Sequence, residues 1–244
     1  MGRATALYGS IVGSTLTGMN VMKHIWAKRA LQITVAFAAG VMLTAHAART
    51  ALPSPQIDLP AGQELQKAVL AGGCFWGVEL VFQHVKGVTD VRSGYAGGKS
   101  YMAHYASVAS GDTGHAESVE ITYDPQRISY GELLRVFFSV AHDPTELNRQ
   151  GPDEGTQYRS TIFVANTEQE RVARAYIEQL QSLKVFDEPI VTTLEPLEGF
   201  YVAEAEHQDY ATRHPNQPYI FLNDRPKLAH LRQQLPELYV ADTQ

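Results

Sequence analysis

The single cysteine of the 244-residue chain, Cys74, lies in a sequence that favours reaction over packing. It follows Gly72 and Gly73 at the end of an apolar run, and a helical pattern starts at or just after it. Such a turn brings backbone N–H groups toward the sulfur, and the positive end of the helix dipole stabilises a thiolate. A free thiol, with a pKa of about 8.5, is only slightly ionised at neutral pH. We therefore expect Cys74 to be a nucleophile.

Two adjacent aromatic residues, Phe75 and Trp76, come directly after the cysteine. A turn from strand to helix is usually exposed, so two aromatic side chains there would line a pocket or be left in water. The plainer alternative is that they only attach the helix to the sheet.

The elements around Cys74 follow from the spacing of apolar residues. Residues 75–85 have helical spacing, and residues 117–123 alternate as in a strand. Strands are also predicted at residues 67–71, 88–95, 161–164 and 190–194, and helices at 203–214 and 226–235. Capping boxes, Ser129 with Glu132 and Thr167 with Glu170, open two further helices. Strands and helices interleave without a linker, which predicts a single α/β or α+β domain over residues 64–240.

The N-terminal 47 residues are expected to be an extension and a signal peptide. A basic flank over residues 23–29 precedes a mostly apolar run over 30–44, and Ala45-His46-Ala47 is an A-x-A cleavage sequence. The apolar run is shorter than the ~20 residues that span a membrane. This predicts export to the periplasm or another extracytoplasmic space, with cleavage after Ala47. The alternative is a membrane anchor formed by an uncleaved signal. Residues 48–63, with three prolines, are predicted to be an extended leader.

Composition excludes several classes of function. The net charge is −6, and no long basic stretch follows the N-terminus, so a nucleic-acid partner is not expected. One cysteine excludes an intrachain disulfide and cysteine-based zinc sites, so no metal site is expected.

Six motifs in order resemble those of the A-type peptide methionine sulfoxide reductases. They are GCFWG at 73–77, GYAGG at 94–98, SGDTGHAE at 110–117, HDPT with NRQG at 142–151, D-x-GTQYRS at 153–160 and HQDY at 207–210. The likeness covers about residues 69–226. It implies an α+β single domain in which a mixed β-sheet is flanked by helices, a two-layer sandwich of the ferredoxin-like kind. It also implies peptide-methionine (S)-S-oxide reductase activity and protein repair after oxidative damage.

The resemblance assigns four catalytic residues. Cys74 matches the nucleophile, whose thiolate attacks the sulfoxide sulfur; the oxygen is protonated and leaves as water, and a sulfenic acid forms on the enzyme. Glu117 matches the acid, and its place at the start of an apolar strand suits a buried carboxyl with a raised pKa. Tyr105 and Tyr158 match two tyrosines that hydrogen-bond the oxygen. The residues before Tyr105 depart from the usual Asn-Pro-Thr, so a plain surface tyrosine is the alternative there.

Four more residues are expected to contact the substrate. By resemblance, Phe75 and Trp76 hold the S-methyl group, with Tyr158 closing the pocket. Asp153 and His207 resemble positions that line the site, although residues of these types in loops are often only solvated. His115 is expected to support the loop before Glu117 instead.

The chain departs from the family at its recycling cysteine. Ile220 stands where many members have that cysteine, and Ala109 stands where another is frequent. No bound cofactor is expected. The sulfenic acid must instead be reduced by an external thiol, such as a thioredoxin-like partner or dithiothreitol in vitro. The other expected partners are the substrates: oxidised proteins and peptides, and free methionine sulfoxide. The enzyme is expected to be a monomer.

Two other functions remain open from the residues alone. A cysteine hydrolase would use His115, His142 or His207 as the base for Cys74. A binding module would recognise oxidised methionine and leave it unchanged, so turnover separates it from a reductase.

Overall fold

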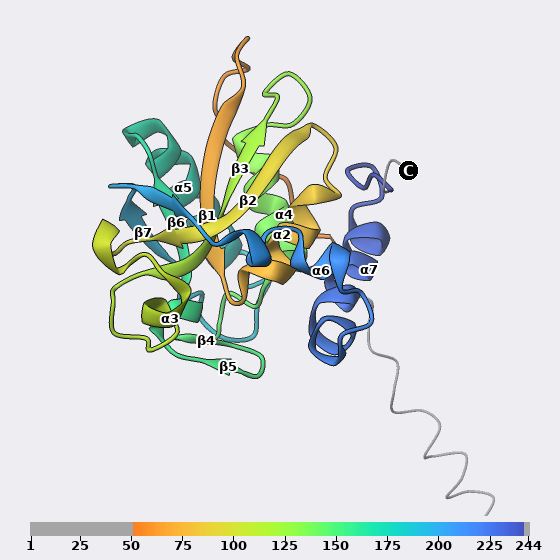
Figure 1. The fold of residues 1–244 in the computed structure, drawn as a ribbon. Coiled ribbons are helices and arrows are strands. Elements are labelled where there is room, and N and C mark those ends of the chain that lie inside the picture. The colour runs from red at the N-terminus through yellow and green to blue at the C-terminus, as the bar shows by residue number, and fades with distance from the viewer. Residues whose placement is uncertain (1–50, 242–244) are drawn as a thin grey trace, which may run out of the picture. The chain divides into compact units, whose positions relative to one another are not determined.

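The computed structural model describes residues 51–241 (Figure 1). The predicted extension and signal peptide, and the first residues of the leader, lie outside the described residues. A six-stranded sheet has the order β7-β6-β1-β3-β2-β8. Its strands are β1 (Gln66–Gly72), β2 (Val88–Ala96), β3 (Ala116–Tyr123), β6 (Ser160–Val164), β7 (Thr193–Pro196) and β8 (Phe200–Val202). A separate two-stranded hairpin consists of β4 (Arg149–Gln150) and β5 (Asp153–Glu154).

The sheet is mixed. β6 and β7 are parallel, and the other neighbouring pairs of described strands are antiparallel. The α-helices are α2 (Phe75–Gln83), α3 (Tyr105–Val108), α4 (Tyr130–Val136), α5 (Thr167–Ser182), α6 (Tyr210–Arg213) and α7 (Arg225–Gln234). The π-helices Phe137–Ala141 and Ile220–Asp224 extend α4 and precede α7.

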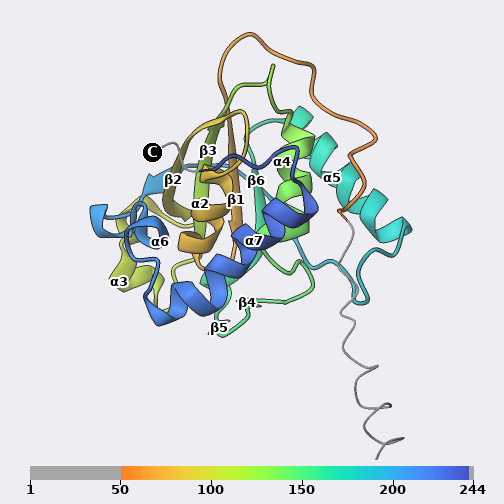
Figure 2. The ribbon, with the colours of Figure 1, turned by 90° about the vertical axis from the view of Figure 1, so that its right-hand side faces the viewer.

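The main core lies between one face of the sheet and the helices. Leu70 and Ile121 from the sheet belong to one cluster with Phe82 of α2, Leu133 of α4 and Tyr176 of α5. Figure 2 shows α4 and α5 together on the same side of the sheet. Alternate residues of β1, such as Val69, belong to a smaller cluster on the opposite face. The predicted α+β fold with helices against a mixed sheet is confirmed.

Residues 51–63 contain no helix or strand but pack against two helices, as the orange trace in Figure 2 shows. The hydroxyl of Tyr176 donates to the carbonyl of Pro53 at 2.8 Å, and Gln179 Nε2 donates to that of Ser54 at 3.0 Å. Asp58 accepts a hydrogen bond from the Gly131 backbone N–H at 2.8 Å. The segment therefore joins α5 to the first turn of α4.

Most predicted elements are present, and the differences have local causes. Ser129 caps α4 by accepting from Glu132 N at 3.2 Å, as predicted. The second predicted cap is wrong by one residue, because Asn166 and not Thr167 accepts from Gln169 N, at 2.9 Å. The strand predicted at 190–194 begins only at Thr193, where pairing with β6 starts. β8, the β4–β5 hairpin and α3 were not predicted.

The helix predicted over 203–214 is also wrong as a continuous element. It is divided into a 3-10 turn at Ala205–His207 and the short α6, with Asp209 between them at a left-handed φ of 54°. Two contacts with α2 hold Asp209: its N–H donates to Glu79 Oε2 at 3.0 Å, and its carboxylate accepts from Gln83 Nε2 at 2.7 Å. Within residues 51–241, no helix is both long and apolar enough to cross a membrane.

Candidate active site

Cys74 lies between the end of β1 and the start of α2. It is the N-cap residue of α2 and is 8% exposed. Gly73, just before it, has a φ of +89°, and a Cβ there would lie 2.5 Å from the Cβ of Gln150. Only glycine fits this turn without displacing its neighbour. Because Leu70 pairs with Val119 in an antiparallel register, the end of β1 lies beside the start of β3, where Glu117 is.

Glu117 is buried against the first turn of α2. Its Oε2 accepts a hydrogen bond from the Phe75 backbone N–H at 3.0 Å, and its side chain is also hydrogen-bonded to Cys74. Burial raises the pKa of the Glu117 carboxyl to about 8, and the nearby charge of Asp153 adds to this, whereas the two hydrogen bonds oppose it. At neutral pH the carboxyl therefore carries a proton that it can donate.

The helix terminus is one of several influences on the thiol pKa of Cys74. The Trp76 backbone N–H donates a hydrogen bond to the Cys74 sulfur, which lowers the pKa of the thiol, as expected at a helix N-terminus. Burial, however, raises the pKa of Cys74 well above its ordinary value, and the carboxylates of Glu117 and Asp224 raise it further when they are ionised. The helix terminus therefore acts on the thiol in the expected direction, but desolvation exceeds its effect and the net pKa shift is upward.

The two predicted tyrosines approach the pair from separate elements. Tyr158 ends the 3-10 turn Thr156–Tyr158, and Tyr105 begins α3. Burial and then the charge of Glu117 raise the pKa of both phenols, so both hydroxyls stay protonated and can donate. Glu204, which the sequence did not single out, positions Tyr105 by accepting from its N–H at 2.9 Å. The same carboxylate accepts from the Tyr95 hydroxyl at 2.9 Å.

Aromatic rings form the side of the site next to α2. Phe75 is buried in the core, and its ring centroid lies 5.4 Å from that of His207. Trp76 is half-buried and stacks on Tyr210 at 3.9 Å between centroids. His207 also contacts Trp76 at 5.9 Å and Tyr105 at 4.3 Å. Phe75 therefore fills the core behind the site, while Trp76 forms part of its half-buried wall.

Asp153 lies on the opposite wall, in the β4–β5 hairpin. Its carboxylate accepts a hydrogen bond from the Tyr219 hydroxyl. Together they line a cavity of about 130 Å³ that also reaches Cys74. The rest of its lining is Gln150, Gly151, Pro152, Asn223 and Lys227. All eight sequence-predicted site residues are thus gathered around the N-terminus of α2. Tyr210 belongs to the HQDY motif but was given no role, and Tyr219 and Lys227 were not predicted as site residues because no local pattern connects them with Cys74.

Two of the three histidines that a hydrolase could use, His115 and His142, are engaged elsewhere, and the third, His207, packs against the aromatic rings of the site. His115 accepts from Gly98 N at 3.2 Å and donates to Lys99 O at 3.0 Å, which supports the loop before Glu117. His142 donates to Phe137 O at 3.1 Å and accepts from the Ser160 hydroxyl at 2.7 Å. Burial lowers the pKa of His142 to about 4, so it is neutral. A carboxyl, not an imidazole, is hydrogen-bonded to Cys74.

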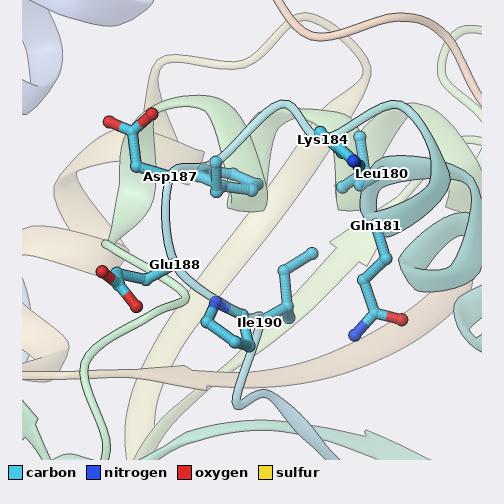
Figure 3. Close-up of a pocket in the computed structure, with 8 residues that line it drawn as sticks. Leu180, Gln181, Lys184, Asp187, Glu188 and Ile190 are labelled. Atoms are coloured by element: carbon cyan, nitrogen blue, oxygen red, sulfur yellow. The ribbon is translucent and has the colours of Figure 1, made fainter.

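A separate hollow lies away from this site. It has a volume of about 510 Å³ and is lined by the end of α5 and the loop before β7 (Figure 3). Its residues include Lys184, Asp187 and Glu188 but none of the predicted site residues. No group of three or more His, Cys, Asp or Glu within residues 51–241 is arranged to hold a metal ion.

A buried thiol that is hydrogen-bonded to a buried, protonated carboxyl and flanked by two phenols, on an α+β fold, defines a cysteine-dependent enzyme with an acid beside its thiol. The comparisons agree with this class. The family model described as "Peptide methionine sulfoxide reductase" matches residues 66–238. The chain belongs to the peptide methionine sulfoxide reductase family.

Relatives and solved structures support this membership. "Peptide methionine sulfoxide reductase MsrA 2" from Mesorhizobium japonicum is 57% identical over 75% of this chain and 94% of its own length. A protein of the same name from Synechocystis is 51% identical over 75% of this chain and 87% of its own length. The reduced form of Mxr1 from Saccharomyces cerevisiae matches with a TM-score of 0.57 and 33% identity, covering 66% of this chain and 92% of that one. Methionine sulfoxide reductase A of Corynebacterium diphtheriae matches with a TM-score of 0.55 and 33% identity, covering 69% and 86%.

Proposed function

We propose that the chain reduces the S epimer of methionine sulfoxide to methionine, free and in proteins, with Cys74 as the nucleophile. Methionine sulfoxide gains two electrons and Cys74 loses two, becoming a sulfenic acid. The product is an unoxidised methionine side chain, so the reaction is a repair of oxidised proteins. The observation that carries this proposal is the buried Cys74–Glu117 pair in a chain of this family.

The residues around the pair suit defined roles in this reaction. Glu117 donates one proton and the Cys74 thiol supplies the other, so that the S–O bond breaks and the sulfoxide oxygen leaves as water. A second water then attacks the Cys74 sulfur of the Cys74–sulfonium adduct, which releases methionine, forms the sulfenic acid and returns a proton to Glu117. The hydroxyls of Tyr105 and Tyr158 hydrogen-bond the sulfoxide oxygen as charge develops on it. Trp76, backed by Phe75, contacts the S-methyl group, while His207 and Asp153 orient the substrate through Tyr105 and Tyr219.

The test uses residues 48–244 and a peptide that contains both epimers of methionine sulfoxide, with excess dithiothreitol and chiral chromatography. We expect loss of the S form alone, and no loss with Cys74→Ser. If a folded protein binds the peptide but reduces neither form, the chain is a binding module. Covalent acylation by an ester probe that persists in Glu117→Gln would instead favour a hydrolase.

The reductant is an external thiol, and a thioredoxin-like protein is the proposed physiological one. The single cysteine leaves no second thiol in the chain, and Ile220, at the position of a recycling cysteine, is fully buried. An external thiolate attacks the sulfenic acid, a mixed disulfide forms and water leaves. A second thiol then releases Cys74.

Export is proposed from residues 1–47, whose pattern is that of a signal peptide. The mature chain would begin at Ala48, with 48–63 as its leader and 64–240 as the reductase domain, and would act as a periplasmic monomer. N-terminal sequencing of native protein tests this: Met1 or Met22 at the terminus would contradict cleavage. Size-exclusion chromatography of the mature chain tests the monomer.

A further inference from the structure

One cationic side chain among the described residues lines the Cys74 cavity without a role so far. It is Lys227, in the first turn of α7, with a side chain 17% exposed. Its Nζ lies 3.4 Å from Oδ1 of Asp224, whose side chain is 0% exposed. Neither oxygen of Asp224 accepts a well-formed hydrogen bond within residues 51–241. Burial raises the pKa of the Asp224 carboxyl, and the charge of Lys227 opposes this, so the two side chains form a coupled, largely buried pair.

The Asp224–Lys227 ion pair lies against the first turn of α2, the helix that Cys74 caps. A Cβ on Gly77, the third residue of α2, would lie 2.1 Å from Asp224 Oδ1 and 2.7 Å from Lys227 Nζ. No other residue type fits at 77 while both charged groups keep these positions. Gly77 therefore lets the C-terminal ion pair approach the first turn of α2, and Lys227 and Cys74 line the same cavity.

Apart from Lys227, the charged side chains that act on Cys74 disfavour its thiolate. Glu117 on β3 and Asp224 raise the pKa of the thiol, and Lys227 is the charged side chain that lowers it. The remaining titratable groups around Cys74 are Asp153 on β5, Tyr105 on α3, Tyr158 and Tyr219. The reaction needs a sulfur anion twice: when Cys74 attacks the sulfoxide, and when it leaves the mixed disulfide as a thiolate.

We infer that Lys227 supplies the positive charge that stabilises the Cys74 thiolate. Asp224 is a positioning residue: its ion pair with Lys227 fixes the place of the ammonium group and partly offsets its charge. This inference rests on the proposed function, because it assigns a charge partner to the same nucleophile. It gives the C-terminal segment, which lacks a recycling cysteine, a direct part in the reaction.

The test is the pH dependence of Cys74 alkylation by iodoacetamide in the full chain, which has no other thiol to interfere. Lys227→Met should raise the midpoint of the profile and slow alkylation at neutral pH roughly tenfold. Asp224→Asn should shift the midpoint downward. Lys227→Arg, which keeps the charge, should stay close to the unmodified chain. Arg232→Met, which removes an exposed positive charge from the same helix, is the matched control and should change nothing.

Opposite shifts of the alkylation midpoint in Lys227→Met and Asp224→Asn exclude a purely structural role. Loosened packing would shift the midpoint of both variants in the same direction. The inference is overturned if Lys227→Met behaves like Arg232→Met, or if Lys227→Met and Asp224→Asn shift the midpoint alike. Thermal unfolding checks that each variant folds, and Lys227→Gln replaces Lys227→Met if the latter does not. Alkylation needs no substrate, so the result is independent of the proposed function, which fails only if the unmodified chain reduces no sulfoxide.

Discussion

At the scale of single residues, burial decides the protonation of the site. Glu117 is 3% exposed, and removing its carboxylate from water raises its pKa to about 8 although a backbone N–H donates to it. The same burial raises the pKa of the Cys74 thiol. The site thus holds its acid ready at neutral pH, and an anionic sulfur needs stabilisation from other groups.

Glu117→Gln should therefore remove the proton donor and lower the rate of sulfoxide reduction by about 10²- to 10⁴-fold at neutral pH. In the unmodified chain, the acid is lost as pH rises through about 8, so turnover should fall on that alkaline side. Steady-state rates from pH 6 to 9.5 measure both effects. An unchanged rate in Glu117→Gln would contradict the assignment.

The raised pKa of Glu117 also links stability to pH. The folded chain keeps this proton up to about pH 8, whereas an unfolded glutamate loses it near its ordinary pKa of 4.5. Its contribution to the free energy of unfolding is therefore complete below about pH 4.5 and is lost as pH rises toward 8. Urea unfolding at pH 5 and pH 8 should show a smaller loss in Glu117→Gln than in the unmodified chain.

At the scale of elements, the leader and the start of α4 depend on each other. Asp58 accepts from Gly131 N at 2.8 Å and from the hydroxyl of Ser129, the residue that caps α4. The leader therefore reinforces the helix terminus from outside the helix. A sequence pattern cannot reveal this, because 71 positions separate Asp58 from Ser129.

Asp58→Ala should lower the free energy of unfolding by about 1–3 kcal/mol, since it removes a charged acceptor from partly buried donors. Asp187→Ala, in an exposed loop, is the control and should change it by less than about 0.5 kcal/mol. Urea unfolding monitored by circular dichroism measures both. Equal effects of the two substitutions would show that Asp58 does not stabilise α4.

At the scale of the whole molecule, the proposed reaction cycle uses a single thiol of the chain. After one turnover without reductant, the chain should carry a sulfenic acid and no intramolecular disulfide. Adding a monothiol should give a single mixed disulfide at Cys74, measured by intact mass. Sustained turnover with a reductant that has no thiol would contradict the proposed regeneration.

The sequence predicted the local elements well where the pattern is local. The strand that ends at Gly72, the helix after Cys74 and the Ser129 cap all depend on residues a few positions apart. Predictions failed where a distant contact decides the backbone. Asp209 is held in a left-handed conformation by Glu79 and Gln83 of α2, so a pattern over 203–214 alone suggested a continuous helix.

The sequence by itself determined the family and the single cysteine, because these depend on residue identity and order. Only the tertiary structure decided the charge environment of Cys74. The pKa values of Cys74 and Glu117 depend on burial and on charges from β3, β5 and the C-terminal segment. Desolvation and Coulomb energies depend on distance in space, which spacing along the chain does not fix. No sequence pattern therefore connects Lys227 with Cys74. The packing of α7 against α2 brings the two residues to one cavity.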